Sequence, residues 1–349
     1  MKKSVFQHII ECLPAEPAHN LRMAGLRFVG KLPTGRWWLK MALAPRDQKM
    51  AKSVFGLTFR NPIGVGAGID PNARCVGEIA AMGFGFVEIG AVTCQAQPGT
   101  PRPRLRRMKD SSSYIDNSGY PSKGMEYVLE KIRDCHKSND GLIIGCSIGK
   151  LTATQRIDTP KEYLRVFRNM YQYVDFFTIN IAGNTSAKRF VPRSREEILQ
   201  LIEPLFEFRR GQLDYRPILL KISPDLSNEE IDTIVDILIE TPLDGIEAVA
   251  GSNNMCPDAS GALSGAMLTE RAINIVRYIA KRTEGNYPII GSGGMMTPDD
   301  IASMLDAGAS LVALNSGIRE NGFRLLKESS EYIVANQVID TTEESNKTE

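Results

Sequence analysis

Eight short apolar runs, separated by longer segments of helical periodicity, constrain the fold of this chain more than any other feature. The runs are rich in Val and Ile, as is typical of strands buried on both faces of a parallel sheet. Eight βα units in a row favour an α/β fold of the TIM type, a (β/α)8 barrel, over an open doubly wound sheet. The predicted strands are Ile63–Ala67, Phe86–Gly90, Leu142–Ile148, Phe176–Asn180, Ile218–Ile222, Ile246–Ala250, Ile289–Gly291 and Leu311–Asn315.

Helical periodicity between these runs predicts the covering helices. The candidates are Lys161–Tyr173, Arg195–Arg209, Asn228–Ile239, Thr269–Lys281 and Pro298–Asp306. Asn228 and Thr269 are expected to be N-caps, because each side chain can accept a hydrogen bond from the first free amides of its helix.

Residues 1–50 do not follow the βα rhythm and predict a small N-terminal helical segment. We expect helices over Val5–Leu13 and Asn20–Leu32, followed by Trp37 and Trp38, then the barrel over residues 51–335 and a polar tail over 336–349. The second helix has more apolar residues than so small an element can bury, so they should pack on the barrel or form a surface that receives a quinone or touches a membrane. These residues are Leu21, Met23, Leu26, Phe28, Val29 and Leu32.

Composition excludes several classes of protein. A net charge of +1 shows no bias toward nucleic acid, and no apolar run approaches the ~20 residues that span a bilayer. The six cysteines lack metal-ligand spacing and follow no secretory signal, so we expect a cytoplasmic protein, with peripheral contact to the inner face of the cell membrane as the alternative. The three histidines fit neither a zinc site nor a Ser/His relay.

Glycines after several strands point to a phosphate-bearing cofactor. Gly64–Gly68 superficially resembles a dinucleotide fingerprint, but its third glycine comes one residue early and no acidic residue closes a following strand. We interpret these glycines as close backbone packing against a cofactor. The turns Gly291–Gly294 and Asn315–Gly317 follow the last two strands, where TIM barrels commonly bind phosphate through backbone amides.

Two polar residues end neighbouring strands at the predicted barrel mouth. Lys221 closes the fifth strand and Asn180 the fourth, and catalysis in this fold takes place at these carboxyl ends. A fixed cation beside a flavin stabilises the negative charge that develops when the ring accepts a hydride. The alternative is that Lys221 makes an ordinary surface ion pair.

The segment from Cys94 to Ser122 predicts a long loop over the site, because it is rich in Pro and Ser and lacks strong periodicity. It holds a basic cluster that we expect to form local salt bridges in solvent rather than a nucleic-acid contact. The cluster is Arg102, Arg104, Arg106 and Arg107.

A series of ordered motifs closely resembles the dihydroorotate dehydrogenases. They include Asn61–Gly64, Met82–Gly90, Pro98–Leu105, Ile148–Lys150, Leu220–Leu226, Leu263–Gly265, Pro288–Gly291 and Gly308–Val312. Glu16–His19 and the helices around it resemble the class 2 branch, which is membrane-associated and uses quinone. The resemblance covers residues 10 to 330.

This resemblance implies an FMN-dependent dehydrogenase that oxidises a dihydropyrimidine and passes the electrons to a quinone. It assigns catalytic roles to Lys221, Asn180 and Asn184. FMN would be bound by Ala67, Gly68, Ser147, Asn180, Lys221, Gly265, Gly293, Gly294, Ser316 and Gly317. The substrate would contact Asp116, Gly119, Asn184, Ser252 and Asn253.

The substrate pocket departs from the family pattern at several positions. Pro71 stands where the family has a substrate-binding Lys, and Asp116 stands where it has an Asn ligand. The loop after the fourth strand, Asn180–Thr185, is one residue short, with Gly183 and no serine where the family has its catalytic base. After the sixth strand the family's Thr-Asn-Thr-Thr becomes Val249–Ser252. Candidate replacement bases are Thr185, Ser186, Ser252 and Cys256.

Three hypotheses remain open from the sequence. The first is an FMN oxidoreductase of the dihydroorotate dehydrogenase type, acting on dihydroorotate or on another ring compound. The second is a catalytically retired flavin-binding relative with a regulatory role. The third is a phosphate-ligand barrel without flavin.

Overall fold

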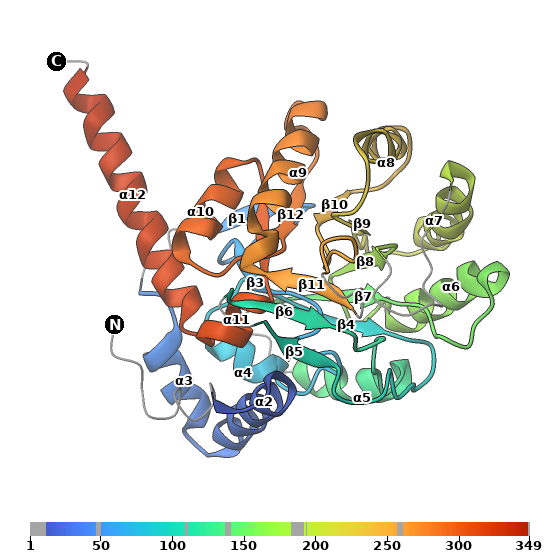
Figure 1. The fold of residues 1–349 in the computed structure, drawn as a ribbon, viewed down its shortest axis with the longest axis horizontal. Coiled ribbons are helices and arrows are strands. Elements are labelled where there is room, and N and C mark those ends of the chain that lie inside the picture. The colour runs from blue at the N-terminus through green and yellow to red at the C-terminus, as the bar shows by residue number, and fades with distance from the viewer. Residues whose placement is uncertain are drawn as a thin grey trace.

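The structure, a computed structural model, describes residues 12–46, 50–108, 111–136, 141–182, 192, 194–256 and 261–347, with side chains omitted for 134–136 and 337–347. Eight parallel strands close into a barrel in the order β10-β12-β13-β3-β4-β7-β8-β9, which confirms the TIM-type prediction (Figure 1). The strands are β3 (Ile63–Val65), β4 (Phe86–Val92), β7 (Ile143–Ile148), β8 (Phe176–Asn180), β9 (Ile218–Ile222), β10 (Gly245–Ala248), β12 (Ile289–Ser292) and β13 (Leu311–Leu314).

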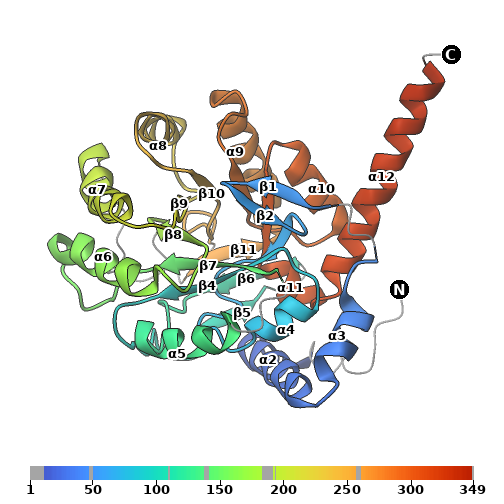
Figure 2. The ribbon, with the colours of Figure 1, turned by 180° about the vertical axis from the view of Figure 1, so that it is seen from behind.

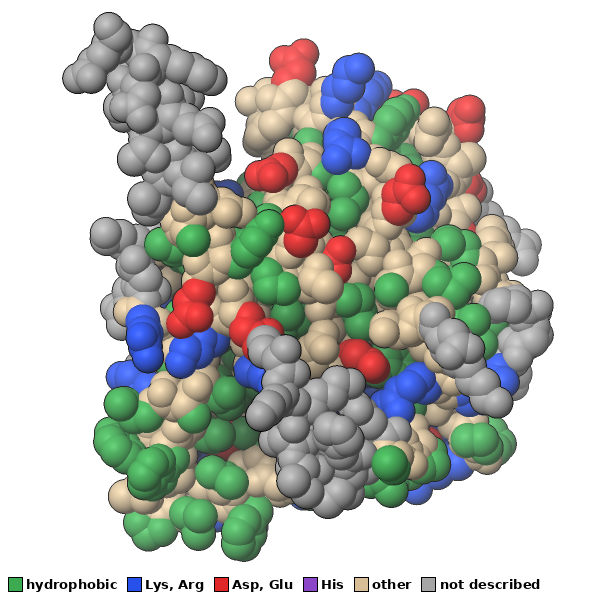
Figure 3. Space-filling model, turned by 60° about the vertical axis from the view of Figure 1, so that its left-hand side comes forward, with side chains coloured by type: hydrophobic (Ala, Val, Ile, Leu, Met, Phe, Trp, Pro, Cys, Tyr) green, Lys and Arg blue, Asp and Glu red, His purple; other side chains and the backbone are tan. Residues whose placement is uncertain are grey.

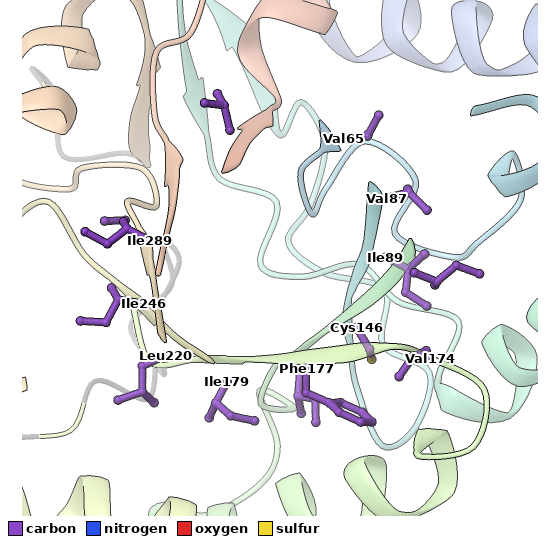
Figure 4. Packing of buried hydrophobic residues seen from close by; sticks show 14 of the residues in the cluster. Val65, Val87, Ile89, Cys146, Val174, Phe177, Ile179, Leu220, Ile246 and Ile289 are labelled. Atoms are coloured by element: carbon purple, nitrogen blue, oxygen red, sulfur yellow. The ribbon is translucent and has the colours of Figure 1, made fainter. Parts of the chain in front are cut away.

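Successive residues of each barrel strand pack alternately in two places, between the barrel and its helices and inside the barrel. Val87, Ile89, Phe177 and Ile179 point away from the barrel toward the surrounding helices (Figure 4). Their neighbours in the sequence point inward, since successive side chains of a strand face opposite sides. The strands therefore read as continuous apolar runs because both faces are buried.

The barrel interior is apolar at its amino-terminal end. One cluster of buried side chains fills it, contributed by Phe86, Phe176, Leu219, Ile290, Leu311 and Ala313. The hairpin of β1 (Lys52–Val54) and β2 (Leu57–Phe59) closes this end, with Val54 and Phe59 in the same cluster (Figure 2). One layer further along the strands, the inward residues become polar, and this layer forms the floor of the site.

The helices confirm the predicted βα rhythm. They are α4 (Val76–Ala81), α5 (Met125–His136), α6 (Thr159–Met170), α7 (Arg195–Arg210), α8 (Asn228–Glu240), α9 (Thr269–Arg282), α10 (Pro298–Asp306), α11 (Ser316–Asn321) and α12 (Leu325–Lys347). The backbone of α12 continues as a helix through the segment expected to be a polar tail.

Both predicted N-caps are wrong by one residue. Ser227, not Asn228, caps α8, and it forms a capping box with Glu230. Leu268 precedes α9, while the Thr269 hydroxyl donates instead to the carbonyl of Gly294 at 2.6 Å. Thr269 therefore braces a glycine turn at the site rather than starting its helix.

The loop after the second barrel strand contains structure that its sequence did not predict. β5 (Leu105–Arg107) and β6 (Ser113–Asp116) pair with each other and with β11 (Ala262–Gly265) in a three-stranded antiparallel sheet. This small sheet brings the loop after β4 against the loop after β10. Two members of the basic cluster make salt bridges, but not local ones: Arg102 reaches Glu16 at 3.0 Å and Arg107 reaches Glu320 at 3.6 Å.

The N-terminal segment forms helices α2 (Ala15–Lys31) and α3 (Gly35–Leu43). α2 begins five residues before the predicted start, because Pro17 falls in its first turn, where a missing amide costs nothing. Trp37 and Trp38 lie within α3. The helix predicted over Val5–Leu13 lies mostly outside the described residues.

An arginine of α2 binds the end of the last short barrel helix. Arg22 donates to the carbonyls of Ile318 and Arg319, at 2.6 Å each, near the end of α11. Leu26 is buried and Met23 packs against the main core, so part of the predicted apolar face does bind the barrel.

The rest of that face is exposed. Hydrophobic side chains gather at the lower edge of the molecule, beneath the C-terminal helix (Figure 3). The large exposed ones on α2 and α3 and in their connection are Leu21, Phe28, Leu32, Trp37, Trp38 and Met41, which we call the N-terminal apolar patch. Among the described helices, none has the length and hydropathy needed to cross a bilayer.

Candidate active site

A pocket opens at the carboxyl ends of the barrel strands, where this fold places its chemistry. Many of the residues predicted to form the site line its walls. Those that do so are Ala67, Gly68, Asp116, Asn180, Lys221, Gly293, Gly294 and Ser316. Seven of the eight barrel strands or the turns that follow them contribute to this lining.

Two glycines form one end of the pocket. Gly293 and Gly294 follow β12 with φ of 102° and 81°, a left-handed conformation that favours glycine. A Cβ on Gly294 would lie 2.5 Å from Thr269 Oγ1 and 2.7 Å from the carbonyl of Gly265. Beside this turn, Ser316 and Gly317 begin α11, and the first amides of a helix have no acceptor within it. The turn therefore presents backbone donors to an anion such as a phosphate.

The glycines after β3 are held by other hydrogen bonds. The amide of Ala67 donates to Glu88 Oε2 at 3.0 Å, and the amide of Gly68 donates to the carbonyl of Gly90 at 2.8 Å. Asn315 donates to the Ala67 carbonyl and Arg319 to the Gly68 carbonyl. Ala67 and Gly68 thus contribute a fixed surface rather than free amide donors.

A buried ionic group forms the floor. Lys221 Nζ lies 2.5 Å from Glu247 Oε1 and 3.7 Å from Glu88 Oε2, and all three side chains are buried. Burial opposes the charge of Lys221, but the carboxylates of Glu247 and Glu88 outweigh it and raise the pKa of the ammonium. Lys221 is therefore not a surface ion pair. It is a permanent cation, neutralised within the protein.

The same surroundings favour the charged form of Lys221 but the neutral form of Glu247. Burial, then repulsion from Glu88, raises the pKa of Glu247 to about 8, against the stabilising charge of Lys221. Burial and Glu88 therefore favour the protonated form of this carboxyl.

Two buried hydroxyls on the neighbouring strands β7 and β8 lack partners within the described part of the chain, and neither residue lines the pocket. Ser147 Oγ and Thr178 Oγ1 are completely buried and make no hydrogen bond there. Asn180 is also buried, and its Oδ1 accepts from the amide of Ala182. Orphaned hydroxyls are rare in folded proteins and are satisfied when a polar ligand binds. With the glycine turn, the lining residues Asn180 and Lys221 fit a ring with polar edges and a phosphate, as in FMN.

The outer wall carries the altered substrate positions. Asp116 and Pro71 both line the pocket, so these two positions contribute a carboxylate and no cation, while Arg319 brings a guanidinium to the same lining. Asp116 Oδ1 accepts from the amide of Ser118 at 2.8 Å, which fixes the carboxylate in its turn. Register supports this position, since Asp116 on β6 pairs with Ala262 on β11 and both line the pocket.

Several predicted residues lie behind the pocket wall. Ser252 donates its hydroxyl to Asp225 Oδ1 at 2.5 Å, and the amide of Asn253 donates to Asp225 Oδ2 at 2.7 Å. Neither residue lines the pocket, and Cys256 is buried beside Ile115 and Leu263.

The remaining glycines support the wall from behind. Gly265 supports Gly294, Gly317 packs on the backbone of Met295, and Gly119 lies between the lining residues Ser118 and Tyr120. The predictions for Gly183, Asn184, Thr185 and Ser186 fall outside the described residues.

Three charged residues of the site were not predicted from the sequence. Glu88 and Glu247 sit inside strands that otherwise read as apolar, and a charged residue in a doubly buried strand is a signal for an internal ion pair. Arg319 lines the pocket from α11, but nothing in its local sequence distinguishes it from a surface arginine. Among the described residues, no cluster of His, Cys, Asp or Glu could hold a metal ion.

Comparison with known proteins decides the family. A family model described as "Dihydroorotate dehydrogenase" matches residues 49–334. The chain belongs to this family. The match covers the whole barrel and extends into α12.

Similar curated relatives belong to the quinone-dependent branch of the family. The "Dihydroorotate dehydrogenase (quinone)" of Christiangramia forsetii is 32% identical over 96% of this chain and 99% of its own length. Those of Pseudoalteromonas atlantica and Thermobifida fusca are 34% and 33% identical, over 93% and 91% of this chain and 98% and 88% of their own lengths. These relatives are enzymes that use quinone.

The fold is shared with a solved structure. A crystal structure of the Eimeria tenella enzyme in complex with ferulenol superposes with a TM-score of 0.77 over 93% of this chain and 92% of that one, at 24% identity.

Proposed function

We propose that this chain is an FMN-dependent oxidoreductase that passes electrons from a ring substrate to a quinone. The observation that carries the proposal is a single pocket with a glycine-built anion cradle at one end and a buried lysine on its floor. FMN bound there would accept a hydride from one substrate and deliver its electrons to the next.

The chain's own residues would hold the cofactor as follows. The turn at Gly293 and Gly294 and the start of α11 would bind its phosphate. Asn180 and Lys221 would face its ring, since each brings a buried polar group to the pocket lining. Ser147 is buried on β7, beside the strand that carries Asn180, and would approach the ring from there. Ser147 Oγ would gain the hydrogen-bond partner that it lacks within the described chain.

We propose that the substrate is not dihydroorotate, which carries a carboxylate, but a ring compound without that negative charge. A carboxylate substrate needs a cation, but Pro71 supplies none and Asp116 would repel it. Arg319 also lines the pocket, but its guanidinium already donates to Asn315 Oδ1 and to the carbonyl of Gly68. Lys221 cannot compensate, because Glu88 and Glu247 already surround its ammonium. The pocket therefore favours a neutral or cationic ring compound.

Electron exit to a quinone is supported by the N-terminal segment. α2 is tied to the end of α11, and α11 begins at the phosphate cradle. The exposed apolar patch lies on this same segment, and we propose it as the surface that receives a lipid-soluble acceptor. Peripheral contact with the cytoplasmic face of the membrane follows from the same patch.

An absorbance spectrum and a reduction assay test the proposal. The purified protein should be yellow, and anaerobic photoreduction should bleach it, with recovery on adding a soluble quinone. A screen of neutral dihydropyrimidines should then yield a substrate that bleaches it without light. A colourless protein that does not bind added FMN would refute the proposal. Bound FMN that no ring compound and no quinone can turn over would instead indicate the retired flavin-binding relative.

A further inference from the structure

The floor of the pocket contains one more carboxyl than cations. Glu88 on β4, Lys221 on β9 and Glu247 on β10 all point into the barrel, and the two carboxyls and one ammonium are at most 8% exposed. Glu247 itself lines the pocket. If both carboxyls were ionised, the group would carry a net charge of −1 in a buried place where solvent screens charge weakly.

The hydrogen bonds of Glu88 and Glu247 leave one oxygen of each carboxyl without a donor among the described residues. Glu88 Oε2 accepts from the amide of Ala67 and Glu247 Oε1 accepts from Lys221. The second oxygens, Glu88 Oε1 and Glu247 Oε2, are buried and have no partner among the described residues. A proton on one carboxyl would let it donate to the other, so that both gain a partner and the excess charge disappears.

The elements around Glu247 decide which groups influence that proton. β9 supplies Lys221, β4 supplies Glu88, and Tyr120 approaches Lys221 from the loop before α5. β12, the other neighbour of β10, supplies the uncharged Ile290 and Ser292. Within the described chain, therefore, the charge of the floor depends on this one network.

We propose that Glu247 carries the shared proton of this network and thereby decides whether the floor is neutral or negative toward a bound ring. With the proton in place, Lys221 and Glu88 cancel, and the floor tolerates negative charge on the ligand above it. Without the proton, the floor is negative and opposes such charge. Glu247 thus acts through the charge of the floor and not by contact with the reacting atoms. This inference rests on the proposed FMN site.

The consequence is a pH-dependent ease of reduction. The pKa of Glu247 is raised to about 8, so the floor is neutral well below that pH and negative well above it. Adding electrons to a ring on the floor then becomes harder above pH 8 than it would be over a permanently neutral floor. Glu247→Gln supplies that neutral floor in nearly the same shape.

Two measurements on holoprotein test the proposal. In the infrared spectrum at pH 6.5, the wild type should show the carbonyl band of a buried protonated carboxylic acid, and Glu247→Gln should lose it. A potentiometric titration gives the midpoint potential of the bound FMN in wild type and in Glu247→Gln. Below pH 7 the difference between the two potentials should be constant. Above pH 8 the wild-type potential should fall progressively further below that of the variant.

A matched control separates charge from shape. Glu229→Gln neutralises a fully exposed carboxylate on α8 and should reproduce the wild-type potential at every pH. Absence of the carboxylic acid band from the wild type, or a constant difference between wild type and Glu247→Gln across the whole pH range, would overturn the inference. Either result leaves FMN binding intact, and is thus distinct from failure of the proposed function.

Discussion

Lys221 and Glu247 are direct partners on neighbouring parallel strands, and their side chains meet 2.5 Å apart inside the barrel. The strand register enforces this pairing, because both residues face inward, one layer above the apolar cluster that fills the barrel. A lysine that could stabilise charge on a cofactor is thereby bound to an acid of the protein. The chemistry available at this site depends on that relationship.

Removal of the cation should weaken the cofactor site. Lys221→Ala should purify with less FMN, and reduction of what remains should slow by about 10²-fold, because one electrostatic contact to the developing charge is lost. Flavin content and anaerobic photoreduction measure this. Lys161→Ala, an exposed lysine on α6, is the control and should match the wild type. Full occupancy with an unchanged reduction rate in Lys221→Ala would contradict the assignment.

Crowding of the glycine turn should abolish phosphate binding. Gly294→Ala would place a Cβ 2.5 Å from Thr269 Oγ1 and should lose bound FMN. Gly285→Ala is a matched control, because it has the same positive φ but nothing within 4 Å. The control should cost about 1–2 kcal/mol of stability from backbone strain and keep its FMN. Equal FMN content in the two variants would show that the turn does not bind the phosphate.

The barrel was predictable because its evidence is local. Each barrel strand is a run of apolar residues, because both of its faces are buried, and these runs predicted all eight barrel strands from the sequence. β5, β6 and β11 were missed because polar residues or a glycine interrupt their few apolar residues, so none of them forms an apolar run. The position of Ser227 as N-cap was missed for a different reason: Ser and Asn both cap helices, and they are adjacent here.

The site was predictable only where strand ends define it. Lys221, Asn180 and the glycine turns follow strands directly, so their position at the barrel mouth follows from the fold. The pairing of Lys221 with Glu247 depends on which strands are neighbours and on their register, which are three-dimensional facts. Asp225, which binds Ser252, is likewise fixed by the packing of one loop on another.

Docking of α2 should weaken in acid. Burial and the nearby charges of Arg319 and Arg22 lower the pKa of His19 to about 3. Between pH 3 and 6.5 the unfolded chain thus binds a proton that the folded chain does not, so stability falls as pH falls through this window. His19→Gln should lose less stability between pH 7 and pH 4.5 than the wild type, measured by urea unfolding. Identical losses would show that His19 is not what destabilises α2 in acid.

The N-terminal apolar patch should bind membranes. Replacement of Trp37 and Trp38 by Ser should reduce partitioning into anionic liposomes by at least about tenfold, since burial of each large side chain contributes about 1.5–3 kcal/mol. Leu213→Ser, an exposed apolar residue after α7, is the control and should bind like the wild type. The double variant should also reduce long-chain quinones more slowly, while its rate with a soluble quinone stays unchanged. Undiminished liposome binding would show that the patch serves another purpose.

We propose that the pocket binds FMN as its family does but fits dihydroorotate poorly. The most direct test is stopped-flow reduction of the bound FMN by dihydroorotate under anaerobic conditions, beside a quinone-dependent relative. Loss of the general base alone should slow reduction by about 10²- to 10⁴-fold, and Pro71 and Asp116 should add to the deficit. A rate comparable to that of the relative would contradict the account and would show that another group of this chain performs the work of the missing serine.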